Sequence, residues 1–270
     1  MTEPIVSSQW LLENLNHPDL IILDASQKAI AADKKEVNKL QIAGARFFDL
    51  KNNFSDTSAH FPNTLPNAAQ FELESQKLGI NSSSIIVVYD NLGIYSSPRV
   101  WWMFKTMGHQ NIFVLNGGLP DWIANNYPTE EKHPQQLELG NFKAHFNADK
   151  VKGYDFIKAN LNNENNITVD ARSSGRFNGT APEPREGLRS GSIPNSFNLP
   201  FGDVLEHGKF KSKEELKAIF SEINPENKAL IYSCGSGLTA CIILLAGELI
   251  LSNSTSVYDG SWTEWAQIEK

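Results

Sequence analysis

Val257-Tyr-Asp-Gly-Ser-Trp-Thr-Glu-Trp265 repeats the pattern of an earlier segment, Val114-Leu-Asn-Gly-Gly-Leu-Pro-Asp-Trp122. The two segments start 143 residues apart and share the valine, a glycine and the final tryptophan. Two further pairs of segments occur in the same order: Ile86-Val-Val-Tyr89 with Ala229-Leu-Ile-Tyr232, and Leu23-Asp-Ala25 with Val169-Asp-Ala171. Three matches in one order indicate a chain that contains the same domain twice.

Each copy is predicted to alternate strands with helices. Short runs rich in β-branched residues are typical of parallel strands buried on both faces, and they occur at residues 20–23, 84–89, 167–170 and 229–232. Helices are expected at residues 67–78, 98–107, 213–221 and 238–251. This alternation predicts the α/β class, with a mostly parallel sheet flanked by helices in each domain. We assign residues 1–127 to the first domain, 128–150 to a polar linker and 151–270 to the second domain.

Composition excludes several classes of protein. Apolar residues make up 40% of the 270 residues and charged residues 20%, which is ordinary globular usage. The net charge of −7 argues against nucleic-acid or acidic-lipid partners. Two cysteines rule out a disulfide framework and favour a reducing compartment, so we expect a cytoplasmic protein. No signal peptide is recognisable, and no apolar run reaches the length of about 20 residues that a membrane span needs.

The chemistry is expected in Tyr232-Ser-Cys-Gly-Ser-Gly-Leu-Thr-Ala240, where a strand runs into a glycine-containing loop and then a helix. Backbone N–H groups of such a loop can converge on an anion, and the helix N-terminus adds its positive dipole end. A thiolate at Cys234 would be stabilised there and would act as a nucleophile. The alternative is that Cys234 is a small buried apolar residue. Cys241 lies within the following apolar helix and is expected to be inert.

Other readings of this loop lack the residues they require. A cysteine-dependent phosphatase needs an arginine six positions after the cysteine, and this chain has Ala240 there. A phosphate-binding P-loop needs a Gly-Lys-Ser/Thr ending, which is missing. The six histidines show no metal-ligand spacing, so we expect no metal. A cysteine protease remains open, because a histidine could approach Cys234 in space.

Positive charge is concentrated between residues 170 and 190. This segment holds four arginines and no lysine: Arg172, Arg176, Arg185 and Arg189. Guanidinium groups bind carboxylates in a planar, bidentate manner, which predicts a local site for an acidic substrate. The alternative is pairing with the neighbouring acidic residues Asp170, Glu183 and Glu186 on the surface, which would contribute little.

The first domain is not expected to repeat this chemistry. The offset of 143 residues places Asn91 opposite Cys234, and an amide cannot serve as the nucleophile. We therefore expect the first domain to cover the site of the second and to contribute a wall to it.

Taken together, these motifs resemble the two-domain sulfurtransferases of the rhodanese superfamily, over nearly the whole length of the chain. The similar segments of the first domain are Tyr95-Ser-Ser-Pro-Arg-Val-Trp-Trp-Met-Phe104 and Asn116-Gly-Gly-Leu-Pro-Asp-Trp122. Those of the second domain are Asp170-Ala-Arg172, Gly175-Arg-Phe-Asn-Gly-Thr180, Pro182-Glu-Pro-Arg185, Gly191-Ser-Ile-Pro194, Cys234-Gly-Ser-Gly-Leu-Thr-Ala240 and Tyr258-Asp-Gly-Ser-Trp262. The resemblance implies tandem rhodanese-like domains, with the active site in the second.

The resemblance also implies a reaction. Cys234 matches the cysteine that becomes a persulfide and then passes its sulfur to a thiol, such as thioredoxin or a small thiol, or to cyanide. Gly235 and Ser236 stand where thiosulfate-using members carry basic residues, a pattern that indicates 3-mercaptopyruvate as donor and pyruvate as product. No organic cofactor is implied. The alternatives are a thiosulfate:cyanide sulfurtransferase and a non-catalytic sulfur carrier or interaction module.

Further site residues follow from the same match. Arg176 and Arg185 correspond to the arginines that hold the mercaptopyruvate carboxylate and carbonyl, and Ser236 to a hydrogen-bond or proton donor for the leaving enolate. The loop backbone would cradle the persulfide; its other residues are Gly235, Gly237, Leu238 and Thr239. The family often has His-Ile-Pro-Gly in the first domain, with a histidine proposed to assist. This chain has Gln41-Ile-Ala-Gly44 instead, so we expect no histidine-assisted step.

Overall fold

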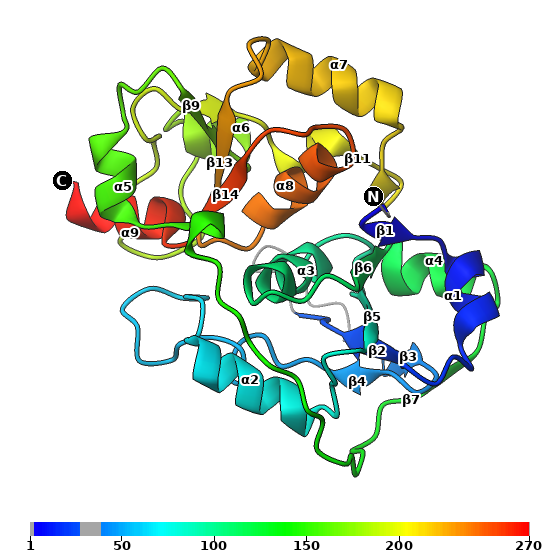
Figure 1. The fold of residues 1–270 in the computed structure, drawn as a ribbon. Coiled ribbons are helices and arrows are strands. Elements are labelled where there is room, and N and C mark those ends of the chain that lie inside the picture. Colours follow the sequence, from blue (N-terminus) through cyan, green and yellow to red (C-terminus); the bar gives the residue numbers. More distant parts are fainter. Residues whose placement is uncertain (1–2, 28–38, 270) are drawn as a thin grey trace. The chain divides into compact units, whose positions relative to one another are not determined.

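The computed structural model describes residues 3–27 and 39–269, which form two compact units. The first unit contains most residues up to 146, and the second contains most residues from 147 onward. Figure 1 identifies the elements of both units.

The sheets of the two units have the same strand order, and every pairing within them is parallel. The first sheet runs β1 (Ile5–Val6), β6 (Ile112–Leu115), β5 (Ile85–Tyr89), β2 (Leu20–Asp24) and β4 (Arg46–Phe47). The second runs β8 (Val151–Lys152), β14 (Thr255–Tyr258), β13 (Ala229–Ser233), β9 (Asn166–Asp170) and β10 (Phe197–Asn198). The expected α/β class and the duplication are confirmed.

Helices cover both faces of each sheet (Figure 1). In the first unit these are α1 (Ser8–Asn14), α2 (Ala68–Lys77), α3 (Ser97–Thr106) and α4 (Gly118–Ala124). In the second they are α5 (Tyr154–Ala159), α6 (Ser174–Phe177), α7 (Lys213–Ile223), α8 (Ala240–Glu248) and α9 (Ser261–Ile268). The four helices expected from the sequence correspond to α2, α3, α7 and α8 within a few residues.

The remaining elements are short. They are the antiparallel pair β3 (Leu40–Ile42) and β7 (Thr129–Glu131), the pair β11 (Leu205–Glu206) and β12 (Lys209–Phe210), and two 3₁₀ turns, Ala148–Lys150 and Phe201–Val204. The two ends of α2 show how local residues set the limits of a helix. Asn67 caps it by accepting the Gln70 N–H, and Gly79 ends the helix with φ 67°.

The boundaries between the units differ from those we expected. Residues 128–146 group with the first unit, where β7 pairs with β3, and do not form a free linker. Residues 57–64 group with the second unit although they precede α2, and residues 207–209 group with the first. The polar sequence of β7 explains the difference, because a strand at the edge of a small sheet needs little apolar surface.

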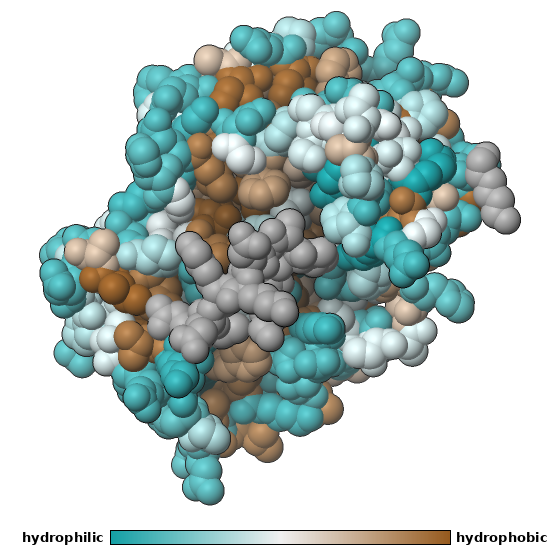
Figure 2. Space-filling view, turned by 180° about the vertical axis from the view of Figure 1, so that it is seen from behind, coloured by the Kyte–Doolittle hydropathy of each residue, from teal (hydrophilic) through white to brown (hydrophobic). Residues whose placement is uncertain are grey.

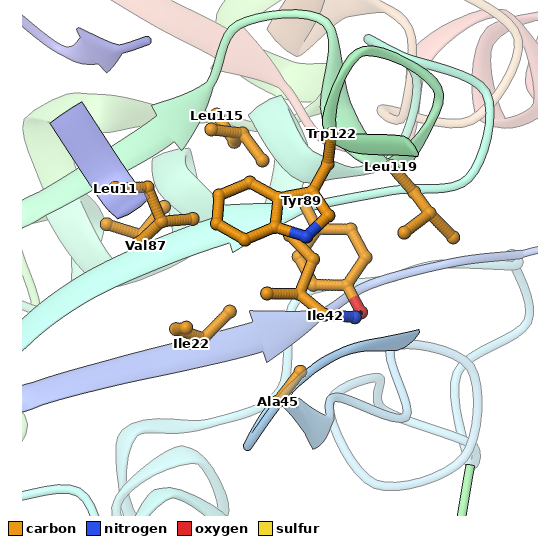
Figure 3. Packing of buried hydrophobic residues seen from close by; sticks show 9 residues of the cluster. All are labelled: Leu11, Ile22, Ile42, Ala45, Val87, Tyr89, Leu115, Leu119 and Trp122. Atoms are coloured by element: carbon orange, nitrogen blue, oxygen red, sulfur yellow. Dashed lines mark hydrogen bonds between the residues drawn. The ribbon is translucent and has the colours of Figure 1, made fainter. Parts of the chain in front are cut away.

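The core of the first unit lies between its sheet and the helices α1 and α4. Val87 and Tyr89 point to this face of β5, and they pack against Leu11 of α1 and Trp122 of α4 (Figure 3). Alternate residues of a strand face opposite sides, so Ile86 and Val88 are buried toward α2 and α3. The second unit repeats this arrangement, with α5 and α9 packed on one face of the sheet and α7 and α8 near the other.

Hydrophilic and hydrophobic side chains both lie on the face seen in Figure 2. Figure 2 shows hydrophilic side chains over much of the face in view, interrupted by smaller hydrophobic areas. Within the described ranges, no helix has the length and apolar character required to cross a membrane.

Candidate active site

Cys234 directly follows β13, the middle strand of the second sheet. Because all strands there are parallel, their carboxyl ends meet at one edge, where ligand sites of α/β sheets are usually found. The loop from Cys234 to Thr239 leads straight into α8, so the positive end of that helix lies behind the loop. Cys234 is only 2% exposed, and the loop glycine Gly237 has φ 76°.

The start of α9 fixes the shape of this loop. The Ser261 hydroxyl accepts the N–H groups of Cys234 and Gly237, both at 3.1 Å, and donates to the Tyr258 carbonyl at 2.8 Å. Thr263 donates its N–H and its hydroxyl to the Gly235 carbonyl. Ser261 has φ 53°, an uncommon conformation for a residue with a side chain. The Gly-Ser-Trp motif therefore serves to hold the cysteine loop.

Several amides of the loop are left open. In the described part of the chain, the N–H groups of Gly235, Ser236, Leu238 and Thr239 have no hydrogen-bond partner. The N–H of Gly237 differs because it is bound to Ser261. Open backbone donors beside a helix N-terminus can receive an anion, which is the property expected of this loop.

The four arginines of residues 170–190 have different environments. Arg172 is 1% exposed, forms a 2.6 Å ion pair with Asp170 and lies 4.5 Å from the centre of the Trp262 ring. Burial works against its charge, yet hydrogen bonds to Asp170 and Glu183 hold the pKa of Arg172 above its ordinary value. Arg189 is exposed. Its guanidinium also lies over the Trp262 ring, and it donates to the Glu269 carbonyl. Neither arginine has its charge directed at the cysteine loop.

Arg176 and Arg185 lie beside the loop. A Cβ atom placed on Gly235 would be 2.9 Å from NH2 of Arg176 and 3.6 Å from NH1 of Arg185. Arg185 also donates to the Ser236 hydroxyl at 3.0 Å and lies 3.4 Å from the Thr263 hydroxyl. The structure thus brings together Cys234, Ser236 and the two arginines singled out from the sequence. Any side chain at position 235 would displace a guanidinium group.

Glu183 holds the first of these arginines in place. The side chain of Glu183 has 0% exposure. Its carboxylate binds Arg176 through two contacts, from Oε2 to Nη2 at 2.6 Å and from Oε1 to Nε at 3.1 Å. The same Oε1 accepts NH1 of Arg172 at 2.7 Å. From the sequence we expected Glu183 to be a surface partner only. Its burial within an arginine pair has no signature in the sequence.

Asn63 is a site residue that the sequence analysis missed. It lies in the segment 57–64, which groups with the second unit, and its Nδ2 donates to Ser236 Oγ at 2.9 Å. The two residues are 173 positions apart, so no local pattern could connect them. Gln41, which replaces the family histidine, instead donates to the Ala45 carbonyl and to Glu130 within the first unit.

The equivalent loop of the first unit is shifted by one residue from our expectation. Ala25 donates to Tyr89 and Ala171 to Ser233, the last residues of β5 and β13. One residue further, the N–H of Leu119 in α4 donates to the Asp90 carbonyl, as that of Trp262 in α9 donates to the Cys234 carbonyl. Asp90, and not Asn91, is therefore the counterpart of Cys234. The loop between β5 and α3 is one residue longer than the loop between β13 and α8, so a constant offset paired the wrong residues.

Cys241 lies where the sequence indicated. It is fully buried in α8, and its Sγ is 3.4 Å from the Gly237 carbonyl. Among the residues that the structure describes, no group of three or more histidine, cysteine or acidic side chains is arranged to hold a metal ion.

Comparison with known proteins identifies the family. The model of the rhodanese-like domain matches this chain twice, at residues 7–125 and 154–268. The chain belongs to the rhodanese family, and it carries two copies of the domain. This confirms the resemblance inferred from the sequence.

The matched relatives include proteins named for 3-mercaptopyruvate, for thiosulfate and for both donors. The 3-mercaptopyruvate sulfurtransferase of Homo sapiens is 39% identical, covering 97% of this chain and 91% of its own. The thiosulfate sulfurtransferase of Rattus norvegicus is 40% identical over the same shares. The crystal structure of SseA from Escherichia coli, titled as a 3-mercaptopyruvate sulfotransferase, has a TM-score of 0.85 at 33% identity and covers 97% of this chain and 99% of its own. Overall identity therefore does not separate the two donors.

Proposed function

We propose that this protein transfers sulfur from 3-mercaptopyruvate to a thiol or to cyanide, by way of a persulfide on Cys234. The observation that carries the proposal is the placement of two guanidinium groups, those of Arg176 and Arg185, beside Gly235. This residue directly follows the only thiol at the sheet edge of the second unit's described residues. A donor that carries both a carboxylate and a transferable sulfur fits such a pair of groups.

The first half-reaction breaks one carbon–sulfur bond. The Cys234 thiolate attacks the sulfur atom of the donor, and the electron pair of that bond leaves with the pyruvate enolate. Arg176 and Arg185 hold the carboxylate and carbonyl, so the donor sulfur faces the thiolate at a fixed distance. The enolate then takes up one proton and departs as pyruvate. Cys234 retains the sulfur as a persulfide, which releases the proton of the donor thiol to water and becomes an anion.

The loop amides stabilise the product of this step. The open N–H groups of Gly235, Ser236, Leu238 and Thr239 receive the negative charge of the terminal sulfur. Gly237 contributes through its conformation, since its own N–H is bound to Ser261. In the second half-reaction an acceptor thiolate or cyanide attacks the terminal sulfur, and the Cys234 thiolate is released.

Ser236 supplies the proton for the enolate. Its hydroxyl oxygen lies 3.0 Å from Nη2 of Arg185, one of the two arginines proposed to hold the carboxylate and carbonyl of the donor. A hydroxyl in this position reaches the atoms on which the enolate charge develops. Water then returns the proton to Ser236.

Thiosulfate is the second candidate donor, because relatives of both kinds match equally well. Two features favour mercaptopyruvate. A basic side chain at position 235, as thiosulfate-using members carry there, would have to displace the Arg176 guanidinium, since a Cβ would lie 2.9 Å from it. Ser236 has a proton to give, and only mercaptopyruvate has a leaving group that requires one. A direct comparison of kcat/KM for the two donors decides between them, and a preference for thiosulfate would refute our choice.

Intact-mass spectrometry tests the covalent step. After incubation with 3-mercaptopyruvate and without acceptor, the wild-type protein is expected to gain one sulfur atom and to release one pyruvate per chain. Cys234→Ser should show neither change. Cys241→Ser is the matched control and should behave as wild type, because Cys241 is buried in α8. Sulfur gain without pyruvate would indicate a carrier module instead of this enzyme.

A pair of arginine variants tests donor binding. Arg185→Ala is expected to raise KM for 3-mercaptopyruvate at least about tenfold, the cost of losing a charge-assisted hydrogen bond. The matched control is Arg189→Ala, which removes an arginine of the same segment that contacts Trp262 and Glu269. Equal effects of the two substitutions would mean that Arg185 has no part in donor binding.

We propose a thiol as the physiological acceptor, either thioredoxin or a small thiol, and a reducing compartment such as the cytoplasm. Two cysteines that remain free in a 270-residue chain support a reducing environment. A relative from Arabidopsis thaliana, 38% identical over 98% of this chain, is named as mitochondrial, so cell fractionation is the deciding measurement. Detection in mitochondria alone would overturn the cytoplasmic assignment.

A further inference from the structure

Asn63 reaches the cysteine loop from a distant part of the chain. The segment 57–64 packs with the second unit, and the Asn63 amide donates to Ser236 Oγ at 2.9 Å. Its backbone has φ 61°, a left-handed conformation that asparagine adopts more readily than most residues with side chains. Backbone and side chain are therefore both suited to presenting this amide to the loop.

The Ser236 hydroxyl has a defined direction because of its two partners. Asn63 Nδ2 and Arg185 NH2, at 2.9 and 3.0 Å, can only donate hydrogen bonds. Both lone pairs of the hydroxyl oxygen are thus engaged, and its hydrogen cannot point at either partner. Ser236 is 5% exposed, so bulk water does not compete freely for that hydrogen. It is left to be donated within the site.

We propose that Asn63 is a positioning residue that directs the Ser236 proton to the leaving enolate. The inference rests on the proposed function and adds a specific residue to it. When the carbon–sulfur bond breaks, the enolate carbon takes the hydroxyl hydrogen of Ser236, and pyruvate forms. Oγ becomes an alkoxide, which the donors Asn63 and Arg185 stabilise until water restores the proton. Because neither donor titrates near neutral pH, this relay adds no ionisation to the rate profile between pH 6 and 8.

The experiment compares two substitutions at this position. Asn63→Gly keeps the left-handed backbone without strain and removes the amide. We expect pyruvate formation under single-turnover conditions to slow about tenfold, with KM changed less than twofold. This is less than the roughly hundredfold or larger loss for a donor that contacts the reacting atoms directly, because Asn63 acts through Ser236. Asn63→Asp turns the donor into an acceptor that takes the hydroxyl hydrogen, so its loss is expected to be larger, about a hundredfold.

Donor choice separates positioning from a structural role. Sulfur loading from thiosulfate, measured by intact mass, involves no enolate and should proceed in Asn63→Gly at the wild-type rate. The matched control is Asn195→Gly, which also replaces an asparagine of positive φ, 60°, whose amide binds the Leu161 carbonyl and Asn162. It should leave both donors unaffected. Thermal unfolding of all variants verifies that they are folded.

The possible outcomes are distinguishable. Equal slowing with both donors, a change confined to KM, or wild-type rates in Asn63→Gly would each overturn the role of Asn63 while leaving the proposed function intact. If the wild-type protein itself forms no pyruvate, the proposed function fails, whatever the variants do.

Discussion

The loop after β5 in the first unit and the loop after β13 in the second share one geometry and differ in what occupies it. In the first, the Asp90 carboxylate accepts the N–H groups of Leu92, Tyr95, Ser96 and Ser97 at 2.8–3.0 Å. It also accepts the Ser97 hydroxyl at 2.7 Å and is fully buried. In the second, the counterpart of Asp90 is Cys234, and four amides of its loop are open, those of Gly235, Ser236, Leu238 and Thr239.

This difference shows how one duplicated motif acquired two roles. Strand, loop and helix N-terminus together form an anion cradle in both units. The first unit fills the cradle with its own carboxylate, which satisfies the backbone donors and stabilises the fold. In the second unit these donors have no such carboxylate, and in the function proposed above they bind an anion that forms only during catalysis. We therefore expect the first unit to be inactive for two reasons: it has no thiol at this position, and the carboxylate of Asp90 already binds the loop amides.

The largest expected effect comes from exchanging these occupants. Cys234→Asp copies the arrangement of the first unit, so persulfide formation should fall by at least roughly a thousandfold, as for loss of any nucleophile. The same substitution should nevertheless give a folded protein that is more stable than Cys234→Ala, because the new carboxylate meets open amides and the nearby Arg176 and Arg185. Thermal unfolding of the two variants checks this. A less stable Cys234→Asp would show that the loop is no anion cradle.

The converse change removes the natural occupant. Asp90→Ala leaves several buried N–H groups without a partner, each of which costs about 1–3 kcal/mol. We expect the free energy of unfolding of the first unit to fall by about 3 kcal/mol or more, measured by denaturant titration. Asp19→Ala, at an exposed site of the same unit, is the matched control and should change it by less than about 0.5 kcal/mol. Similar effects for both would contradict a filled cradle.

Sequence patterns predicted the strands and helices better than they predicted which residues of the two loops correspond. Buried strands such as β5 and capped helices such as α2 depend on local residues, which is why their positions were predicted to within a few residues. The pairing of Cys234 with Asn91 was wrong because one extra residue in the first loop interrupts a constant offset. Local patterns also do not report that residues 57–64 join the second unit, because that grouping depends on contacts with distant residues.

The site was predictable to the extent that its residues are close in sequence. Cys234 and Ser236 share one loop, and Arg176 and Arg185 share one segment, so each pair could be identified from its own motif. Asn63 comes from a turn 173 residues before Ser236, and Glu183 owes its role to burial between two arginines. Such contacts depend on tertiary structure, and a single sequence does not report them.

A smaller effect, on thermal stability, is expected when the loop amides beside Cys234 bind the persulfide that forms there. Persulfide formation on Cys234 supplies the anion that the open amides lack, which resembles the permanent state at Asp90. Loading the protein with sulfur should therefore raise its unfolding temperature by roughly 5 °C, which corresponds to about 1–3 kcal/mol for a domain of this size. Adding cyanide removes the sulfur and should reverse the change. Cys234→Ser treated in the same way serves as the control, and a rise in that variant would refute the explanation.

The smallest expected effect concerns acid. Burial lowers the pKa of His109, whose Nε2 lies 2.9 Å from the Ser84 carbonyl in the first unit. Burial raises the pKa of Glu264, in the second unit. A histidine with a lowered pKa binds protons more readily when unfolded, so the first unit loses stability as pH falls below about 6.5. An acid with a raised pKa binds them more readily when folded, so the second unit gains stability as pH falls.

The two units should therefore respond to acid in opposite directions. When the pH is lowered from 7.5 to 5.5, hydrogen exchange followed by mass spectrometry is expected to show faster opening of peptides around β5 and α3. Peptides around β13 and α9 should show no faster opening. His109→Gln keeps a donor toward the Ser84 carbonyl but does not titrate, so it should abolish the change in the first unit, which amounts to roughly 2 °C in unfolding temperature. Glu264→Gln should leave the first unit unaffected. An unchanged acid response in His109→Gln would assign it to another group.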